Sequence, residues 1–446
     1  MPLRLTLLFT LWLGACSAPN APLPLPQDSG VLRVLTLNAA GTYYLNREDA
    51  PEGPEHDRVL AFAVAQGWQL EWQVESSIGA LLQALEQGQA HMAAAGLTRL
   101  PSRDARLRPG RAYAQTTQQV VCRRGLDLPR SVAELAGRSL EVAADSSYEE
   151  ALRALQAQIP QLSYTANAEM GTERLLVRVA EGALDCTVAD SQIVAMNQRV
   201  LPQLVVAFDL SPAQDLVWYF PPWAGAVATA SRRWLRSAAG RAELARVDER
   251  YYGHLAEFDF VDMRALNRRI EARLPDYLPL FLRAEQRTGL PADLLAAVAY
   301  QESNWNPRAI SPTGVRGLMM LTQNTAASLG VKNRLDPQES VEAGARYLAE
   351  QHRRLPDEIP EPDRTYMALA AYNVGRGHLL DARTLARRLG RNPDSWAELR
   401  EVLPLLADER YHRELRHGYA RGHEPVHYVQ RVRNYRDVIA HVMRSS

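Results

Sequence analysis

Residues 290–306 read LPADLLAAVAYQESNWN, and this stretch is the starting point for interpreting the whole chain. Pro291 suits the first turn of a helix, where its missing N–H is not needed. Leu295, Val298 and Glu302 follow at spacings of three and four residues, which predicts one helix whose buried face carries the carboxyl group. Burial and the negative end of the helix dipole both oppose ionisation there. We therefore expect Glu302 to stay protonated near neutral pH, although an ordinary polar helix end is the alternative for this short motif alone.

The size and composition of the chain indicate a globular protein with several domains. Its 446 residues are enough for two or three domains, each with its own core. Hydrophobic residues make up 46% of the chain and charged residues 23%, which is typical of globular proteins. The formal net charge is zero, so no overall field favours nucleic acid. We expect no nucleic acid partner.

The N-terminus has the plan of a secretory signal. Residues 3–13 are mostly apolar with one early arginine, Arg4, and the run is too short to stop in a membrane. It ends in Leu-Gly-Ala-Cys, which resembles the lipobox of bacterial lipoproteins. That resemblance implies cleavage before Cys16, a lipid on Cys16, and, because Ser17 is not Asp, an anchor at the periplasmic face of the outer membrane. A plain signal with a chance cysteine is the alternative.

The other cysteines and the histidines give no metal site. Cys122 and Cys186 are able to pair in an oxidising compartment, but the sequence does not show that they are close, and two separate buried thiols are the alternative. His423 and His427 are four residues apart, yet Pro425 between them argues against a shared helix face. No phosphate-binding loop is present either. We expect no metal and no cofactor.

From residue 31 onward, short β-rich runs alternate with amphipathic helices, which predicts an α/β domain. A polar loop, residues 96–103, follows one of these strands at the edge where open α/β sheets place ligands. The predicted strands are 31–37, 69–74, 91–95, 139–143 and 184–190, and the predicted helices are 57–66 and 78–87.

The loop sequence GLTRLPSR resembles the G-x-T-x-T-P-x-R region of periplasmic solute-binding proteins for amino acids, and the resemblance covers about residues 31–257. It implies a two-lobed fold in which Thr98 and Arg103 hold the carboxylate of an amino acid or a cell-wall peptide. The planar guanidinium group suits that task. Asp190, at the end of a later strand, would hold the ammonium group. Surface charge is the alternative for Arg103 and Asp190 taken singly.

Two details refine this expectation. Ser146 precedes a predicted helix, where backbone N–H groups can receive an anion. Leu100 stands where the family often has Thr or Ser, so one hydroxyl contact is missing. The first lobe is expected to extend to about Val121 and the second to about Val205, after which the chain returns to the first lobe.

Beyond Leu266 the β-rich runs disappear and helical periodicity takes over, with predicted helices at 276–287 and 364–371. Four segments in this part resemble the lysozyme-like lytic transglycosylase domain: Glu-Ser at 302–303, GVRGLM at 314–319, AYN at 371–373 and EPVHYV at 424–429. The resemblance implies that Glu302 is the catalytic residue. It also implies that substrate is bound or oriented by Ser303, Gly317, Leu318, Met320, Tyr372, Asn373 and Tyr428. Met320 replaces the glutamine that is usual in the family.

The lack of acids after Glu302 limits the reactions that this site can catalyse. No Asp or Glu occurs between Ser303 and Leu335, so no second carboxylate is offered nearby in sequence, whereas ordinary glycoside hydrolysis uses two. A single carboxyl group needs another nucleophile, and the C6 hydroxyl of the sugar itself would give a 1,6-anhydro product. Two alternatives remain open: a muramidase that uses water, and a receptor whose C-terminal domain only binds murein.

The fold class that we expect is a two-lobed α/β periplasmic-binding-protein-like domain followed by a mainly α lysozyme-like domain. The combination on one lipoprotein resembles a group of membrane-bound lytic transglycosylases, which implies peptidoglycan as partner and substrate. The expected division is a signal peptide at 1–15, a tether at 16–30, the solute-binding module at 31–257, a linker at 258–271 and the catalytic domain at 272–446.

Overall fold

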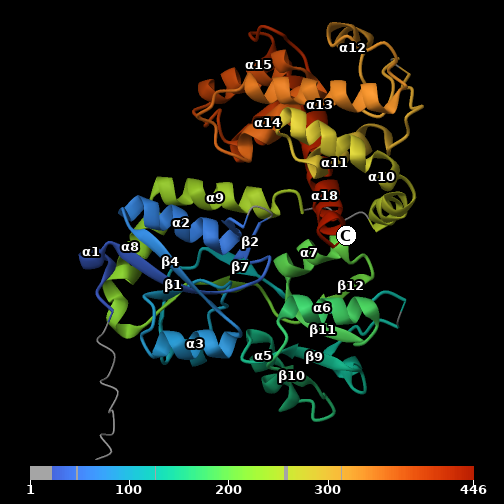
Figure 1. The fold of residues 1–446 in the computed structure, drawn as a ribbon. Coiled ribbons are helices and arrows are strands. Elements are labelled where there is room, and N and C mark those ends of the chain that lie inside the picture. Colours follow the sequence, from blue (N-terminus) through green and yellow to red (C-terminus); the bar gives the residue numbers. More distant parts are fainter. Residues whose placement is uncertain (1–22, 47–48, 126, 256–259, 313, 446) are drawn as a thin grey trace, which may run out of the picture.

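The computed structural model describes residues 23–46, 49–125, 127–255, 260–312 and 314–445. The chain forms an α/β part, followed by a helical part that lies above it in Figure 1. Cys16 and the expected signal peptide lie outside the described residues. No helix among the described residues is long and apolar enough to cross a membrane.

The α/β part has two lobes, each built on a five-stranded sheet. The first sheet has the order β4-β1-β5-β14-β6, and the second has the order β10-β9-β11-β8-β12. Since β14 follows the second lobe in sequence, the chain leaves the first lobe and returns to it, as expected. The strands are β1 Val31–Leu37, β4 Gln69–Glu75, β5 Met92–Ala93, β6 Arg108–Pro109 and β14 Tyr219–Phe220, then β8 Gln118–Arg123, β9 Leu140–Ala143, β10 Thr165–Asn167, β11 Cys186–Asp190 and β12 Leu204–Asp209, with the small hairpin of β2 Tyr44–Leu45 and β3 Pro51–Glu52 beside the first lobe.

Helices cover both faces of each sheet. Neighbouring residues of β1 show this, because Val34 belongs to the core on one face of the first sheet and Leu35 to the core on the other. The helices of the first lobe are α1 Pro26–Ser29, α2 Pro54–Gln66, α3 Ile78–Glu86, α4 Pro101–Asp104, η2 Pro222–Ala224, α8 Gly225–Arg236 and α9 Ala238–Tyr252, and those of the second are η1 Val132–Leu135, α5 Ser147–Gln156, α6 Thr172–Glu181 and α7 Ser191–Val200.

The crossover between the lobes lies earlier than the sequence predicts. Strands β7 (Ala114–Thr116) and β13 (Gln214–Leu216) pair antiparallel and connect the two lobes. Val121, the expected end of the first lobe, lies within β8 in the second sheet, opposite Thr187 of β11. The prediction was wrong because an apolar strand has the same pattern in either lobe.

The expected tether is not extended throughout. Pro26–Ser29 form the short helix α1, and Leu25 packs against the core of the first lobe. The backbone oxygen of Pro24 lies 3.0 Å from Nε2 of His91. The chain is therefore attached to the first lobe from about Pro24 onward.

Cys122 and Cys186 form a disulfide bond. They stand opposite each other on the antiparallel strands β8 and β11, and both are fully buried. The register of two strands brings the sulfur atoms together, which decides between the two alternatives that the sequence left open.

The helical part surrounds α11 (Ala292–Ser303), the helix of the opening stretch. Every residue from Ala292 to Tyr300 is buried, so the expectation of a single apolar face is wrong, and α11 is a central helix covered on all sides. It packs against α10 and α18. The helices are α10 Phe260–Thr288, α12 Gln323–Ser328, α13 Pro337–Arg353, α14 Asp363–Val374, α15 Arg376–Arg388, α16 Trp396–Val402, η3 Leu403–Ala407, α17 Glu409–His412 and α18 His423–Ser445.

Two helices begin where the sequence predicts otherwise. Helix α10 starts at Phe260, inside the expected linker 258–271, and contains Pro275 and Pro279. Helix α18 contains Pro425 in its first turn, where a proline is tolerated, so His423 and His427 do share one helix. Among the described residues, no group of three His, Cys, Asp or Glu side chains is placed to hold a metal ion.

Side chains of α18 join the two parts. Nε of Arg199, on α7 of the second lobe, donates to Oδ1 of Asn434 at 2.7 Å. His254, just after α9, lies 2.6 Å from Asp437. Figure 1 shows the C-terminal end of α18 beside α7. Helix α18 thus contacts α7 of the second lobe through Asn434 and the end of the first lobe through Arg433 and Asp437.

Candidate functional site

Glu302 occupies the last turn of α11, and a hydrogen bond from α18 holds its carboxyl group. The hydroxyl of Tyr428, on α18, donates to Oε1 at 2.7 Å. Burial raises the pKa of Glu302 to about 7, although the hydrogen bond from Tyr428 acts in the opposite direction. This carboxyl group can therefore give up and take back a proton near neutral pH, as a general acid and base must.

Two tyrosines form one side of this site. The rings of Tyr372 and Tyr428 are stacked, with centroids 6.5 Å apart and an angle of 18° between their planes. Burial, with Glu302 as a second cause, raises the pKa of both hydroxyls well above the usual value. Both hydroxyls therefore stay protonated and act as donors, Tyr428 to Glu302 and Tyr372 to the backbone oxygen of Met319 at 2.8 Å.

Three side chains fix the loop that follows α11. The hydroxyl of Ser303 lies 2.9 Å from the backbone oxygen of Leu318, and Tyr372 holds the oxygen of Met319. The hydroxyl of Ser340, on α13, accepts the N–H of Met319 at 3.1 Å. Met320, the next residue, adopts a left-handed conformation with φ of 46°. The loop is thus held on both sides of the Met319 peptide unit.

Gly317 is required by this arrangement. Its φ is +86°, and a Cβ atom there would lie 1.9 Å from the backbone oxygen of Arg334. Gly344 of α13 makes room for the same loop, because a Cβ atom there would lie 2.6 Å from the side chain of Met319. The glycine that the sequence singled out therefore permits close packing of the loop.

The structure separates the expected substrate-binding residues into two groups. Ser303 is buried and Leu318 is fully buried in the core, so these two side chains position the loop and do not face a substrate, contrary to the expectation for Leu318. Met320 is half-buried and Asn373 is exposed in the last turn of α14, so these two are accessible. Sequence reasoning missed Ser340, although a polar residue beginning the apolar face of α13 was an available signal.

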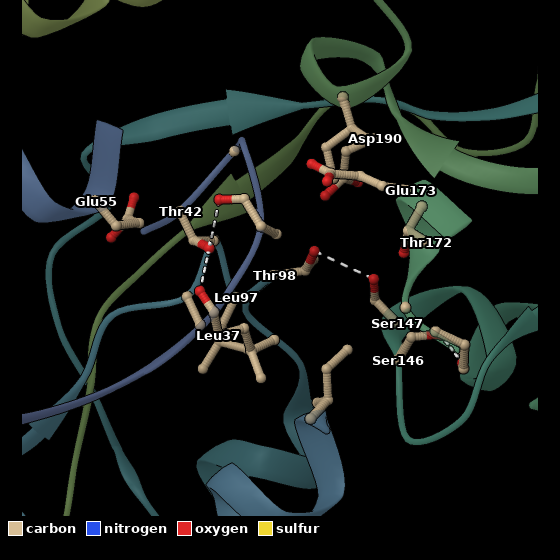
Figure 2. A pocket seen from close by; sticks show the side chains of 18 of the residues that line it. Leu37, Thr42, Glu55, Leu97, Thr98, Ser146, Ser147, Thr172, Glu173 and Asp190 are labelled. Carbon is tan, nitrogen blue, oxygen red and sulfur yellow. Dashed lines mark hydrogen bonds between the residues drawn. The ribbon is translucent and has the colours of Figure 1, made fainter. Parts of the chain in front are cut away.

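A second candidate site lies between the lobes of the α/β part. A cavity of about 720 Å³ is lined by residues of both lobes. All four residues expected from the sequence line it, namely Thr98, Arg103, Ser146 and Asp190. Figure 2 shows Thr98 and Ser147 facing each other, with Asp190 and Glu173 nearby on the second lobe. The structure therefore brings together residues that are far apart in the sequence.

Arg103 is buried and bridges the lobes. Its guanidinium group donates to the backbone oxygen of Thr98 at 2.9 Å and to that of Asp145, in the second lobe, at 3.1 Å. Burial lowers its pKa. A guanidinium group has five N–H donors, so these two bonds leave others for a ligand.

Asp190 ends β11 and begins α7. Burial raises the pKa of its carboxyl group to about 7, whereas hydrogen bonds from Tyr148 and Thr116 and the charge of Arg103 act in the opposite direction. Its Oδ1 atom is buried and has no hydrogen-bond partner among the described residues. A buried carboxyl oxygen without a partner is suited to receive a donor from a ligand.

Other contacts across the cavity hold the lobes together. The N–H of Ala40, in the first lobe, donates to Oε1 of Glu173 at 2.9 Å. The hydroxyl of Ser102 donates to Glu150 at 2.6 Å.

Ser146 serves as the cap of α5, since its hydroxyl accepts the N–H of Glu149 at 3.2 Å. Sequence reasoning missed Glu173, because no motif distinguishes it from a surface acid of α6.

Two family descriptions match the chain. Residues 32–254 match the bacterial extracellular solute-binding proteins, family 3. Residues 279–394 match the transglycosylase SLT domain. Among solved structures, an ancestral arginine-binding protein bound to arginine is similar with a TM-score of 0.47 and 16% identity, covering 50% of this chain and 99% of that chain.

Curated relatives match over nearly the full length. Membrane-bound lytic murein transglycosylase F 2 of Alkalilimnicola ehrlichii is 54% identical, covering 98% of this chain and 97% of the relative. Membrane-bound lytic murein transglycosylase F of Maricaulis maris is 42% identical, covering 95% of this chain and 94% of the relative. Because these relatives match both halves together, the chain belongs to the membrane-bound lytic murein transglycosylase F family, and it is a peptidoglycan lytic transglycosylase.

Proposed function

We propose that Glu302 is the one general acid and base of this enzyme, acting on the β-1,4 bond between N-acetylmuramic acid and N-acetylglucosamine. The observation that carries this assignment is the buried carboxyl group with a pKa of about 7, hydrogen-bonded by Tyr428. Burial and Tyr428 account for its pKa, and no second carboxylate among the described residues contributes. The raised pKa of Glu302 therefore does not come from coupling to another carboxylate among the described residues.

The reaction then has two proton transfers. Protonated Glu302 gives its proton to the glycosidic oxygen as the bond from C1 of the muramoyl residue breaks. The carboxylate then takes the proton of the C6 hydroxyl as this oxygen bonds to C1. The products are a 1,6-anhydromuramoyl end and a free C4 hydroxyl, and Glu302 is protonated again. Tyr428 holds the carboxyl group in place, and the accessible Met320, Tyr372 and Asn373 orient the sugar.

Hydrolysis by water is the second candidate for the same site. It would use a second carboxylate as base or nucleophile. The pKa of Glu302 gives no support for a second carboxylate, because burial and the hydrogen bond from Tyr428 are the causes of its shift. The two reactions differ by one water in the mass of the product.

Glu302→Gln tests the acid and base. General acid–base catalysis contributes roughly 10²–10⁴-fold, so we expect turnover to fall by at least about a hundredfold while murein is still bound. Since protonated Glu302 is required for the first step, the wild-type rate should fall as the pH rises above about 7. Mass spectrometry of anhydro ends released from purified murein measures both effects.

The exposed Glu358 provides a matched control, and Glu358→Gln should keep the wild-type rate. Appreciable anhydro product from Glu302→Gln would overturn the assignment. Products that carry reducing ends would replace it with hydrolysis.

Ser340→Ala tests whether the loop positions the substrate. It leaves the buried N–H of Met319 without its acceptor, which costs about 1–3 kcal/mol of stability. We expect kcat to fall about tenfold with a smaller change in KM, because the loop beside Glu302 is less well held. The measurements are thermal unfolding and anhydro-product rates, with the exposed Ser328→Ala as control. A loss of stability with an unchanged kcat would restrict Ser340 to a structural role.

We assign an amino acid or a cell-wall peptide as the ligand of the cavity between the lobes. Asp190 offers a buried, unpartnered carboxyl oxygen to an ammonium group. Arg103 offers its remaining N–H donors to a carboxylate. The donor and the acceptor lie in one cavity, so a zwitterionic group fits it.

Calorimetry on the full chain with muropeptides and with free amino acids tests the cavity. An ammonium group beside Asp190 stabilises the carboxylate, so binding near pH 7 should release a proton, seen as a heat that depends on the buffer. Asp190→Asn should abolish that release and weaken binding at least about tenfold, by the cost of about 1–3 kcal/mol for a lost charged partner. Asp127→Asn, at an exposed acid, is the control. Absence of heat with every such ligand would leave the module without this function.

We further propose that the ligand modulates catalysis through α7 and α18. Asp190 directly precedes α7, whose residue Arg199 donates to Asn434 of α18. Tyr428 lies on the same helix, about 9 Å along its axis from Asn434. Movement of the second lobe on ligand binding therefore acts directly on the helix that holds Glu302.

Asn434→Ala tests this connection. It removes the contact with the second lobe, so the rate of anhydro-product formation should no longer respond to muropeptides, while ligand binding persists. The exposed Arg431 of the same helix provides the control, and Arg431→Gln should keep the response. A response that is unchanged in Asn434→Ala would contradict this route.

The proposal of a membrane anchor is based on the N-terminal sequence and on the names of the relatives. The lipobox-like residues before Cys16 support a lipid on Cys16, and Ser17 supports the periplasmic face of the outer membrane. The relatives are named membrane-bound.

A further inference from the structure

One face of the first lobe carries more exposed positive charge than exposed negative charge. It consists of α8, the first turn of α9 and the outer side of α2, and we call it the α8 face. These three helices pack against one another. Figure 1 shows α8 and α2 next to α1 at one end of the lobe. The exposed cations of the α8 face are Arg232, Arg233, Arg236 and Arg241.

The acids of this region do not neutralise these arginines. Within 54–66 and 222–242 the acids are Glu55 and Asp57, and both are buried. The next acid of α9, Glu243, pairs with Arg246, and the neighbouring helix α1 carries the exposed Asp28. None of the four arginines takes part in an ion pair found among the described residues. The whole chain has a formal net charge of zero, so this face is a local excess of positive charge.

Exposed apolar side chains occur on α2 and directly before α8. Val64 of α2 is 69% exposed and Leu60 is 41% exposed, although both are large and apolar. Trp223, which directly precedes α8 within η2, is 37% exposed. Tryptophan and arginine side chains together are typical of surfaces that lie on phospholipid headgroups.

The N-terminal segment reaches the lobe beside this face. The oxygen of Pro24 lies 3.0 Å from His91, and the His91 ring packs edge-on against Trp223 with centroids 5.6 Å apart. Leu25 packs against the core to which Trp234 of α8 belongs. Pro24 is eight positions after Cys16, a distance that covalent geometry limits to about 27 Å. A lipid on Cys16 thus keeps this end of the lobe close to the membrane surface.

We propose that the α8 face binds the anionic phospholipid headgroups of the membrane. The location of the membrane rests on the proposed lipid at Cys16, but the charge and the apolar side chains belong to the face itself. Binding places the first lobe flat on the surface and leaves the helical part, on the far side of α9 in Figure 1, directed toward the murein. A second copy of this face is not a suitable partner, because like charges repel.

The test uses the full mature chain carrying Cys16→Ser, so that no lipid contributes to binding. Flotation with phosphatidylcholine vesicles that contain phosphatidylglycerol should recover the protein, whereas phosphatidylcholine alone should not. Each arginine near an anionic surface contributes about 1 kcal/mol, so R232Q/R233Q/R236Q/R241Q should weaken binding by roughly a hundredfold or more. High salt should weaken the parent protein in the same direction.

A second variant separates this face from charge in general. R130Q/R268Q/R283Q/R413Q removes four exposed arginines elsewhere and gives the same net charge. It should bind vesicles like the parent protein, and both variants should keep the parent unfolding temperature. Equal loss in the two variants, or no binding by the parent protein, would overturn the proposal.

The anchor is tested separately by labelling wild-type cells with a palmitate analogue. Label on the wild-type chain but not on Cys16→Ser supports the anchor. Missing label removes the anchor and leaves the vesicle result to decide the α8 face by itself.

Discussion

The hydrogen bond from Tyr428 to Glu302 is the interaction on which the rest of the structure depends. It joins the last turn of α11 to the first turns of α18, helices separated by more than a hundred residues. Burial makes the carboxyl group reluctant to ionise, and the single donor keeps it oriented without making it a permanent carboxylate. The loop on the other side is held by Ser303, Ser340 and Tyr372, so that neither wall of the site depends on exposed groups.

The same physical cause operates at both sites of the protein. Burial raises the pKa of Asp190 and that of Glu302 to about 7. Asp190 lies at the end of the buried strand β11, and Glu302 lies near the end of the buried helix α11. They differ in what surrounds them. Asp190 faces a cavity that also contains Arg103, which suits recognition of a charged ligand. Glu302 has neutral tyrosines beside it, which suits proton transfer to and from a sugar.

Helix α18 gives these two sites a common element. One part of it carries Tyr428, and a later part contacts Arg199 of the second lobe through Asn434. Burial lowers the pKa of Arg199 to about 10, and its hydrogen bonds to Asn434 of α18 and to the backbone oxygens of Ala195 and His254 offset the cost of that burial. The enzyme therefore does not consist of two modules joined only by a chain segment, because a packed interface lies between them.

Local sequence determined a large part of this description. Alternating and helical periodicities predicted β1, β4, β5, β9 and β11 and the helices α2 and α3, and the strand ends placed Thr98, Arg103 and Asp190 at one edge. The Glu-Ser pair predicted the acid at the end of a helix. These features depend on residues that are close in sequence, so local periodicity is enough to predict them.

Only the tertiary structure decided the features that depend on distant segments. Strand register joins Cys122 to Cys186, and packing buries Leu318 while Met320 remains accessible. No sequence motif marks Ser340, because its role depends on accepting the N–H of Met319, in the loop that follows α11. Local periodicity tells which residues avoid water, but the partner that each polar group finds is settled when the helices and strands pack together.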